Sequence, residues 1–138
     1  MNTLRWSDLS VGLSDAFEVT VTAAMMDRFR QDSGDLNPLH ADAEYARSRG
    51  FDDVVVFGLL TASFYSTLVG VYLPGKHVLL HGVSVDFQRP VYPGTRLRVS
   101  GEISHLNEAY RRADMIARIT DAGGVRVSKA RIGFGVNE

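Results

Sequence analysis

The chain contains no cysteine at all, and it has only four prolines among its 138 residues. The absence of cysteine excludes disulfide bonds, thiolate nucleophiles and zinc fingers, and it fits a reducing compartment. An excess of charge of one sign is also missing, because 15 Lys and Arg residues nearly balance 16 Asp and Glu residues, which leaves a net charge of −1. No global basic field is therefore available to recruit nucleic acid or anionic lipid. We expect a cytoplasmic protein.

A long membrane-spanning run is also not evident. The first eight residues lack the apolar segment of a secretory signal. The stretch from Val54 to Gly75 carries no charge, but Gly58 and Gly70 interrupt it and several Ser and Thr hydroxyls lie within it. Its valine-rich start is typical of extended chain, which leaves a helix shorter than a bilayer requires. We predict a helix buried on nearly every side, with a single membrane span as the alternative.

The composition indicates one folded domain over residues 1–138. Hydrophobic residues make up 45% of the chain and charged residues 22%, which is typical of a globular protein of this length. We find no internal repeat, low-complexity segment or linker that would mark a domain boundary.

Helical signals occupy the first half of the chain. Thr22 is a suitable N-cap for a helix with apolar residues at helical spacing, and Gly34 suits its left-handed end. Asp42 can cap a short helix that closes at Gly50, and the uncharged helix follows over about 58–72.

Strand signals occupy the second half, where apolar and polar residues alternate from Val78 onwards. The three apolar sets are Leu79, His81, Val83, Val85 and Phe87; Leu97, Val99, Gly101 and Ile103; and Ala113, Met115, Ala117 and Ile119. Residues 121–124 form a hairpin turn, and a change of parity predicts a bulge near Ser128. We predict an α+β domain in which four long antiparallel strands and an edge strand at Phe17–Thr20 face the apolar helix.

The segment between the first two helices has the residue types for proton transfer. Pro38 forces Asn37 towards an extended conformation, so Asp35 and His40 lie on a shaped loop. A carboxylate beside an imidazole handles protons near neutral pH. The alternative is a structural loop in which Asp35 and Asn37 bind local amides and His40 lies on the surface. The residue types alone leave both interpretations open.

Metal binding is disfavoured by the residues that would supply it. His77 and His81 lie on a predicted strand, where residues four apart are separated by about 13 Å, too far to share one zinc ion. Asp35, His40 and Asp42 form a second candidate set, but the N-cap role explains Asp42 without a metal. His105 stands in a turn-like stretch and is predicted to lie on the surface.

Gly58 opens the uncharged helix, and free amides in a first helical turn suit a carbonyl oxygen that gains negative charge. Ser63 lies one and a half turns further on. The structural alternatives are a plain helix start for Gly58 and a bond to the helix backbone for Ser63. The sequence carries no nucleophile elbow, P-loop or dinucleotide fingerprint.

Residues 33–42, SGDLNPLHAD, resemble the hydratase motif of the MaoC-like dehydratases, which include the (R)-specific enoyl-CoA hydratases. Tyr45-Ala46 matches the pair in the short helix that follows in this family. Residues 58–63 and 73–75 look like the two ends of the family's central helix, and 87–94 resemble its strand-and-turn signature.

The resemblance implies a hot-dog fold, in which an antiparallel sheet wraps around one long helix. It also implies a homodimer, commonly with two sheets joined edge to edge, and an acyl-CoA or acyl-carrier-protein thioester as substrate. The implied reaction is reversible addition of water to a trans-2-enoyl thioester, which gives an (R)-3-hydroxyacyl thioester. It requires no metal or other cofactor.

The resemblance also implies roles for individual residues. Asp35 and His40 match the catalytic dyad, and both would bind the reacting water. The amide of Gly58 matches the oxyanion donor, Asn37 would order the loop, and Ser63 would line or support the site.

Phe57 departs from the family, which usually has histidine before this glycine. The change affects the shape of the pocket, and it favours the alternative function, a hot-dog module that binds an acyl thioester without turnover. The complete set of Asp35, Asn37 and His40 argues against that alternative. A thioesterase is disfavoured because its acid generally lies on the central helix, which here carries only neutral residues.

Overall fold

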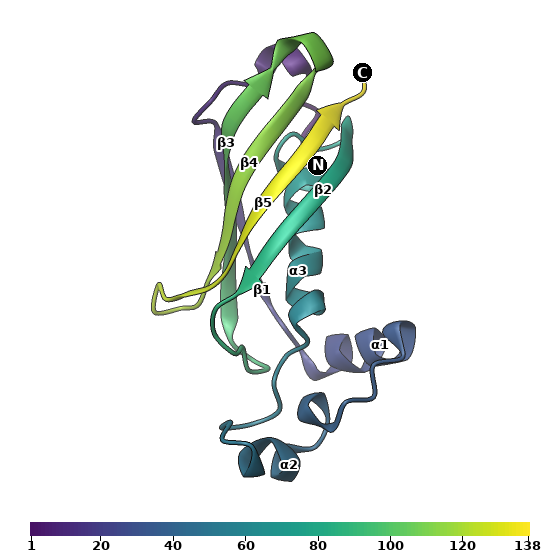
Figure 1. The fold of residues 1–138 in the computed structure, drawn as a ribbon, viewed down its shortest axis with the longest axis vertical. Helices are drawn as coiled ribbons and strands as arrows, with labels where there is room; N and C mark the ends of the chain where they lie inside the picture. The colour runs from purple at the N-terminus through teal and green to yellow at the C-terminus, as the bar shows by residue number, and fades with distance from the viewer.

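The computed structural model describes residues 1–138, and it contains one five-stranded antiparallel sheet in the order β1-β3-β4-β5-β2 (Figure 1). The strands are β1 (Ser14–Thr20), β2 (Val78–Phe87), β3 (Arg96–Asn107), β4 (Arg112–Thr120) and β5 (Arg126–Val136). The helices are α1 (Ala23–Ser33), α2 (Ala43–Ser48) and α3 (Gly58–Thr67), with 3-10 turns at Trp6–Asp8, Pro38–His40 and Glu108–Tyr110.

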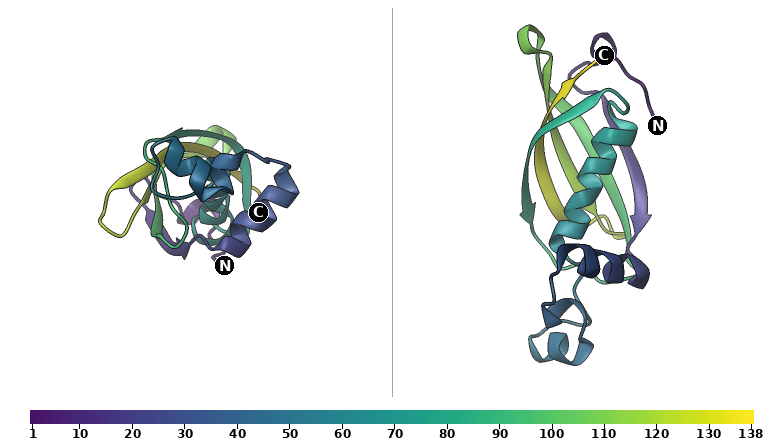
Figure 2. Two further views of the ribbon diagram at one scale, coloured as in Figure 1. Left: turned by 90° about the horizontal axis from the view of Figure 1, so that it is seen from below. Right: turned by 90° about the vertical axis from the view of Figure 1, so that its right-hand side faces the viewer.

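Helix α3 lies along the inner face of the curved sheet, and a π-helical segment, Leu68–Tyr72, prolongs it (Figure 2, right). Buried side chains of the helix, among them Phe64, Tyr65 and Leu68, share one core with the sheet. The prediction of an α+β fold with a sheet around one apolar helix is therefore confirmed. None of the helices has the combination of length and apolarity that crossing a membrane requires.

The alternation on β3 and β4 decides which face of the sheet is buried. On β3, alternate residues from Leu97 to Ile103 are buried, as the pattern predicts. On β4, alternate residues from Ala113 to Ile119 are buried in the same way. On β5 the register shifts opposite the end of β4, so that the adjacent Val127 and Ser128 are both buried. The bulge predicted near Ser128 is confirmed, and it turns a serine hydroxyl towards the helix.

Two expectations about the strands need correction. The apolar residues of β2 were expected to share one covered face, but Leu79 is 56% exposed and Phe87 50% exposed. The reason is that β2 is an edge strand, and a register shift between Leu80 and Gly82 also takes His81 out of the alternation. His105 lies within β3 rather than in a turn, although it is exposed as expected.

The helix caps predicted from sequence are present. The Thr22 hydroxyl accepts a hydrogen bond from the amide of Met25 at the start of α1, and Gly34 ends that helix with φ of 72°. The Asp42 carboxylate accepts from the amides of the first turn of α2. Helices α1 and α2 project beyond the end of the sheet, next to the N-terminus of α3 (Figures 1 and 2). The loop between them is thereby brought to the first turn of α3.

Candidate active site

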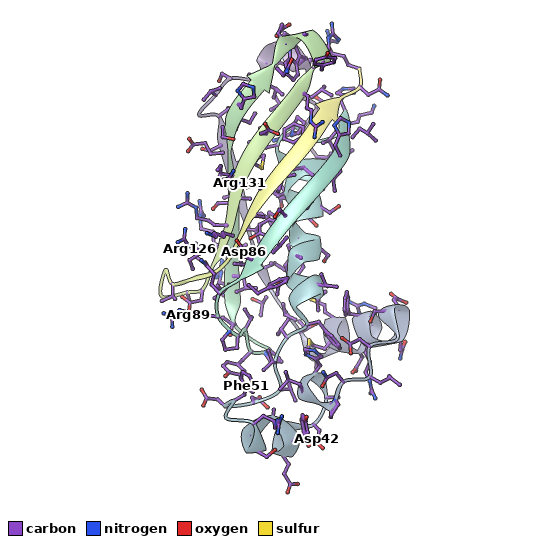
Figure 3. The ribbon with its side chains drawn as sticks, in the orientation of Figure 1. Asp42, Phe51, Asp86, Arg89, Arg126 and Arg131 are labelled. Atoms are coloured by element: carbon purple, nitrogen blue, oxygen red, sulfur yellow. The ribbon has the colours of Figure 1, made fainter.

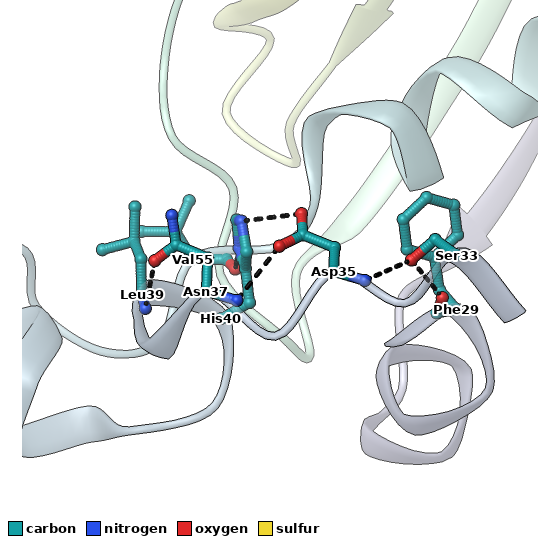
Figure 4. Close-up of polar contacts among 7 residues, drawn as sticks. All are labelled: Phe29, Ser33, Asp35, Asn37, Leu39, His40 and Val55. Carbon is teal, nitrogen blue, oxygen red and sulfur yellow. Dashed lines mark hydrogen bonds and ion pairs between the residues drawn. The ribbon is translucent and has the colours of Figure 1, made fainter. Parts of the chain in front are cut away.

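A chain of local hydrogen bonds shapes the loop that follows α1 (Figure 4). The Ser33 hydroxyl donates to the carbonyl of Phe29 and accepts from the amide of Asp35. Asp35 Oδ1 accepts from the amide of Asn37 at 3.0 Å, and Asn37 Oδ1 accepts from the amide of Leu39 at 3.0 Å. These bonds leave the second carboxylate oxygen of Asp35 free to face the next turn of the chain.

His40 is fixed in one tautomer by its backbone contact. Its Nδ1 lies 2.6 Å from the carbonyl oxygen of Val55, which accepts only, so Nδ1 carries the proton and donates it. The neutral ring therefore has its lone pair on Nε2, the atom a general base needs. Nε2 lies 3.9 Å from Asp35 Oδ2. That gap is too long for a direct hydrogen bond and allows one water molecule to contact both atoms.

Phe57 holds the imidazole plane of His40. The two ring centroids are 4.1 Å apart and the planes differ by 29°. Phe29 packs on Phe57 at 4.9 Å, and Phe57 itself is only 2% exposed. The phenyl ring stands where the resemblance leads us to expect a histidine, and it contacts His40 by stacking.

Gly58 is the first residue of α3, so its amide has no acceptor within the helix. His40 and Gly58 both line a cavity of about 390 Å³. Phe51 and Arg89, from the segments after α2 and β2, line the same cavity (Figure 3). A Cβ atom at position 58 would lie 3.2 Å from the ring of Phe87, so glycine keeps this amide approachable. An imidazole base and a free helix amide therefore open into one space.

Four predicted site residues do not line that cavity, namely Asp35, Asn37, Phe57 and Ser63. Asn37 orders the loop through its bond to Leu39, as expected for a positioning residue. The Ser63 hydroxyl donates to the carbonyl of Leu60 at 2.6 Å, and the residue is exposed, so no contact links it to the site.

Sequence analysis assigned only His40 and Gly58 of the cavity-lining residues to the site, and it missed the others, among them Thr61, Phe87 and Ser128. Thr61 follows Gly58 by three positions on the same helix face, which is a usable signal. Phe87 and Ser128 are register partners across β2 and β5, and only knowledge of the strand pairing would have brought them together.

The candidate metal ligands are not grouped. Asp42 turns its carboxylate to the amides of Glu44 and Tyr45, and no cluster of three His, Asp or Glu residues is placed to hold a metal ion. Asp35 remains beside His40, and Asp42 is not part of this pair.

Comparison with known proteins places the chain in a family. The model of the MaoC like domain matches residues 13–123. An (R)-specific enoyl-CoA hydratase of Aeromonas caviae is 35% identical over 84% of this chain and 87% of its own length. A 3-hydroxybutyryl-CoA dehydratase of Methylorubrum extorquens is 29% identical over 82% of this chain and 72% of its own. The solved (R)-hydratase from A. caviae involved in PHA biosynthesis superposes with a TM-score of 0.89 at 32% identity, covering 93% of this chain and 97% of that one.

Proposed function

Because the chain belongs to the MaoC-like domain family, we propose that it catalyses the reversible hydration of a trans-2-enoyl thioester to an (R)-3-hydroxyacyl thioester. The observation that carries the proposal is the pair of atoms His40 Nε2 and Asp35 Oδ2, 3.9 Å apart. The names of the two curated relatives, a hydratase and a dehydratase of CoA thioesters, agree with it. CoA is accordingly the carrier to test first.

In this mechanism one water molecule bridges Asp35 and His40. His40 Nε2 takes a proton from the water, and the water oxygen bonds to C3 of the enoyl group as the C2–C3 double bond opens. The electron pair moves towards the thioester carbonyl and forms an enolate. The proton held by His40 passes to the carboxylate of Asp35, which delivers it to C2. The atoms balance as one water added across one double bond, and the reverse sequence is the dehydration.

The amide of Gly58 stabilises the enolate oxygen. Its N–H is unpaired within the helix and lies at the positive end of the α3 dipole. A fixed donor of this kind acts on the charge that develops in the transition state and needs no rearrangement during the reaction. Phe57 keeps the imidazole oriented and Asn37 keeps the loop in register, whereas Ser63 has no part in this mechanism.

We propose that a second copy of the chain covers β2, as the family resemblance implied. Strand β2 pairs only with β5, so one of its edges has free backbone groups. Exposed apolar side chains on β2 and α3 surround that edge, and the largest exposures are those of Leu59 at 69% and Leu79 at 56%. Joining two sheets at β2 would pair the edge and bury these side chains.

The hydration test uses crotonyl-CoA and the purified protein. Addition of water removes the conjugated double bond, so the ultraviolet absorbance of the enoyl thioester falls. Chiral chromatography of the hydrolysed product should then give (R)-3-hydroxybutyrate. Constant absorbance with a folded protein would overturn the proposal and favour the non-catalytic acyl-thioester-binding module. An (S) product would show hydration of the opposite stereochemistry and would overturn the proposed (R) specificity.

A further inference from the structure

The cavity contains a polar group that the proposed mechanism does not use. The hydroxyl of Tyr65, on α3, lies 2.8 Å from the hydroxyl of Ser128, on β5. Both residues are 1% exposed, and Ser128 lines the cavity that also contains His40 and Gly58. The two hydroxyls therefore form a buried pair that connects the helix and the sheet at the cavity wall.

A count of protons shows that one donor of this pair is unused. Two hydroxyl groups carry two protons, and the bond between them uses one. Burial raises the pKa of Tyr65 to about 12, so the phenol keeps its proton at neutral pH. Either hydroxyl can donate in this bond, but only Ser128 lines the cavity. In the arrangement that lets the unused proton reach an acceptor in the cavity, Tyr65 donates and Ser128 accepts. The proton of Ser128 then has no acceptor in the protein, and the cavity is the open space beside it.

The other groups around Ser128 do not satisfy this donor. The Thr61 hydroxyl donates to the carbonyl of Gly58 at 2.7 Å and forms no hydrogen bond with Ser128. The neighbouring wall is apolar and includes Phe87, Val91 and Val127. A buried donor in such surroundings costs free energy until an acceptor reaches it.

We propose that the Ser128 hydroxyl, oriented by Tyr65, is a subsite for a hydrogen-bond-accepting oxygen on the acyl chain, and that the protein prefers acyl thioesters with a keto, hydroxyl or ether oxygen. The identity of the ligand as an acyl thioester rests on the proposed function. The subsite specifies, in addition, which class of acyl chain the protein prefers. A plain alkyl chain would cover the donor and leave it unpaired, which is the basis of discrimination at such sites.

The test measures binding of thioesters that do not react. Hexanoyl-CoA is compared with its 4-oxo and 5-oxo derivatives by isothermal titration calorimetry. One neutral hydrogen bond predicts that at least one oxo derivative binds about threefold to tenfold more tightly to the wild type. Because saturated thioesters are not hydrated, the ratio of dissociation constants does not depend on turnover.

Three variants and a control identify the group responsible. Ser128→Ala should abolish the preference, and Tyr65→Phe should weaken it because the serine loses its orienting donor. The double variant Y65F/S128A removes both hydroxyls, which avoids leaving a buried Tyr65 hydroxyl without a partner and guards against misfolding. Ser104→Ala is the matched control, because this exposed serine of β3 bonds only to the carbonyl of Asp114. It should keep the wild-type ratio.

Equal binding of all three thioesters to the wild type would overturn the subsite, and so would a preference that survives in both Ser128→Ala and the double variant. If the protein hydrates crotonyl-CoA but binds hexanoyl-CoA and its oxo derivatives equally, the subsite alone is refuted. If an oxo derivative binds more tightly but crotonyl-CoA is not hydrated, the proposed function alone is refuted. Failure of every acyl-CoA to bind would overturn both.

Discussion

His40 is held on three sides by groups of different chemistry. The Val55 carbonyl fixes its proton on Nδ1, the Phe57 ring stacks on its face, and Asp35 stands 3.9 Å from Nε2. The bond to Val55 fixes the tautomer and so leaves the lone pair on Nε2, and the stacking contact with Phe57 fixes the tilt of the ring. Orientation of this kind decides how well a general base works.

Phe57→His tests how the departure from the family affects the site. A histidine ring keeps a planar group against His40 but places polar nitrogens at a position that is only 2% exposed. We expect a modest change, about twofold to tenfold, in kcat/KM or in the preferred chain length. The measurement compares hydration of four-, six- and eight-carbon enoyl-CoAs by both proteins. Identical values for all three substrates would show that Phe57 is a neutral replacement.

At the scale of helices and strands, the sequence best predicts those features that depend only on neighbouring residues in the chain. Thr22, Gly34 and Asp42 cap their helices as expected, because a cap depends only on residues within one turn. The buried faces of β3 and β4 also followed from alternation. The approach of Asp35 to His40 did not follow from residue types, and only the family resemblance favoured it over a structural loop. The contact between Tyr65 and Ser128 joins residues 63 positions apart, and no local pattern encodes it.

The packing of α3 on the sheet depends on Gly101 of β3. A Cβ atom there would lie 2.5 Å from the sulfur of Met115 and 2.8 Å from Leu68 Cδ2. We therefore expect Gly101→Ala to lower the free energy of unfolding by about 1–3 kcal/mol, through overpacking between helix and sheet. Urea denaturation followed by circular dichroism measures the change.

Gly70→Ala is the control for that experiment, because an added Cβ would meet no heavy atom within 4 Å. Alanine is favoured over glycine in a helix, so the free energy of unfolding of the Gly70→Ala variant should not fall. A Gly101→Ala variant as stable as the wild type would show that the helix and the sheet have room to separate.

At the scale of the whole molecule, the exposed side of β2 is the feature that a single chain leaves unexplained. Alternation correctly indicated apolar residues there, but it carried no information on whether the chain itself or another molecule covers them. Val83 is 41% exposed, although its partner on β5 lies in the interior of the sheet. Leu79 is 56% exposed, and its partner lies near the end of β5. The second copy proposed at this edge would account for the pattern.

The double variant L79D/V83D tests the proposed dimer. Two carboxylates at the joined edge would repel their counterparts and resist burial, while the exposed positions tolerate charge in a single chain. We expect the wild type to sediment as a dimer and the variant as a folded monomer in analytical ultracentrifugation. A wild-type monomer, or a variant that remains dimeric, would exclude β2 as the interface.

The central claim is that Asp35 and His40 share one reacting water, and the most direct measurement compares two carboxylates of the same loop. Asp35→Asn removes the proton-transfer group while keeping its shape, whereas Asp42→Asn keeps an N-cap of equal quality. With crotonyl-CoA as substrate, the account predicts that kcat falls about 10²–10⁴-fold in Asp35→Asn. It predicts that Asp42→Asn stays close to the wild type. Wild-type turnover in Asp35→Asn, or an equal loss in both variants, would contradict the dyad.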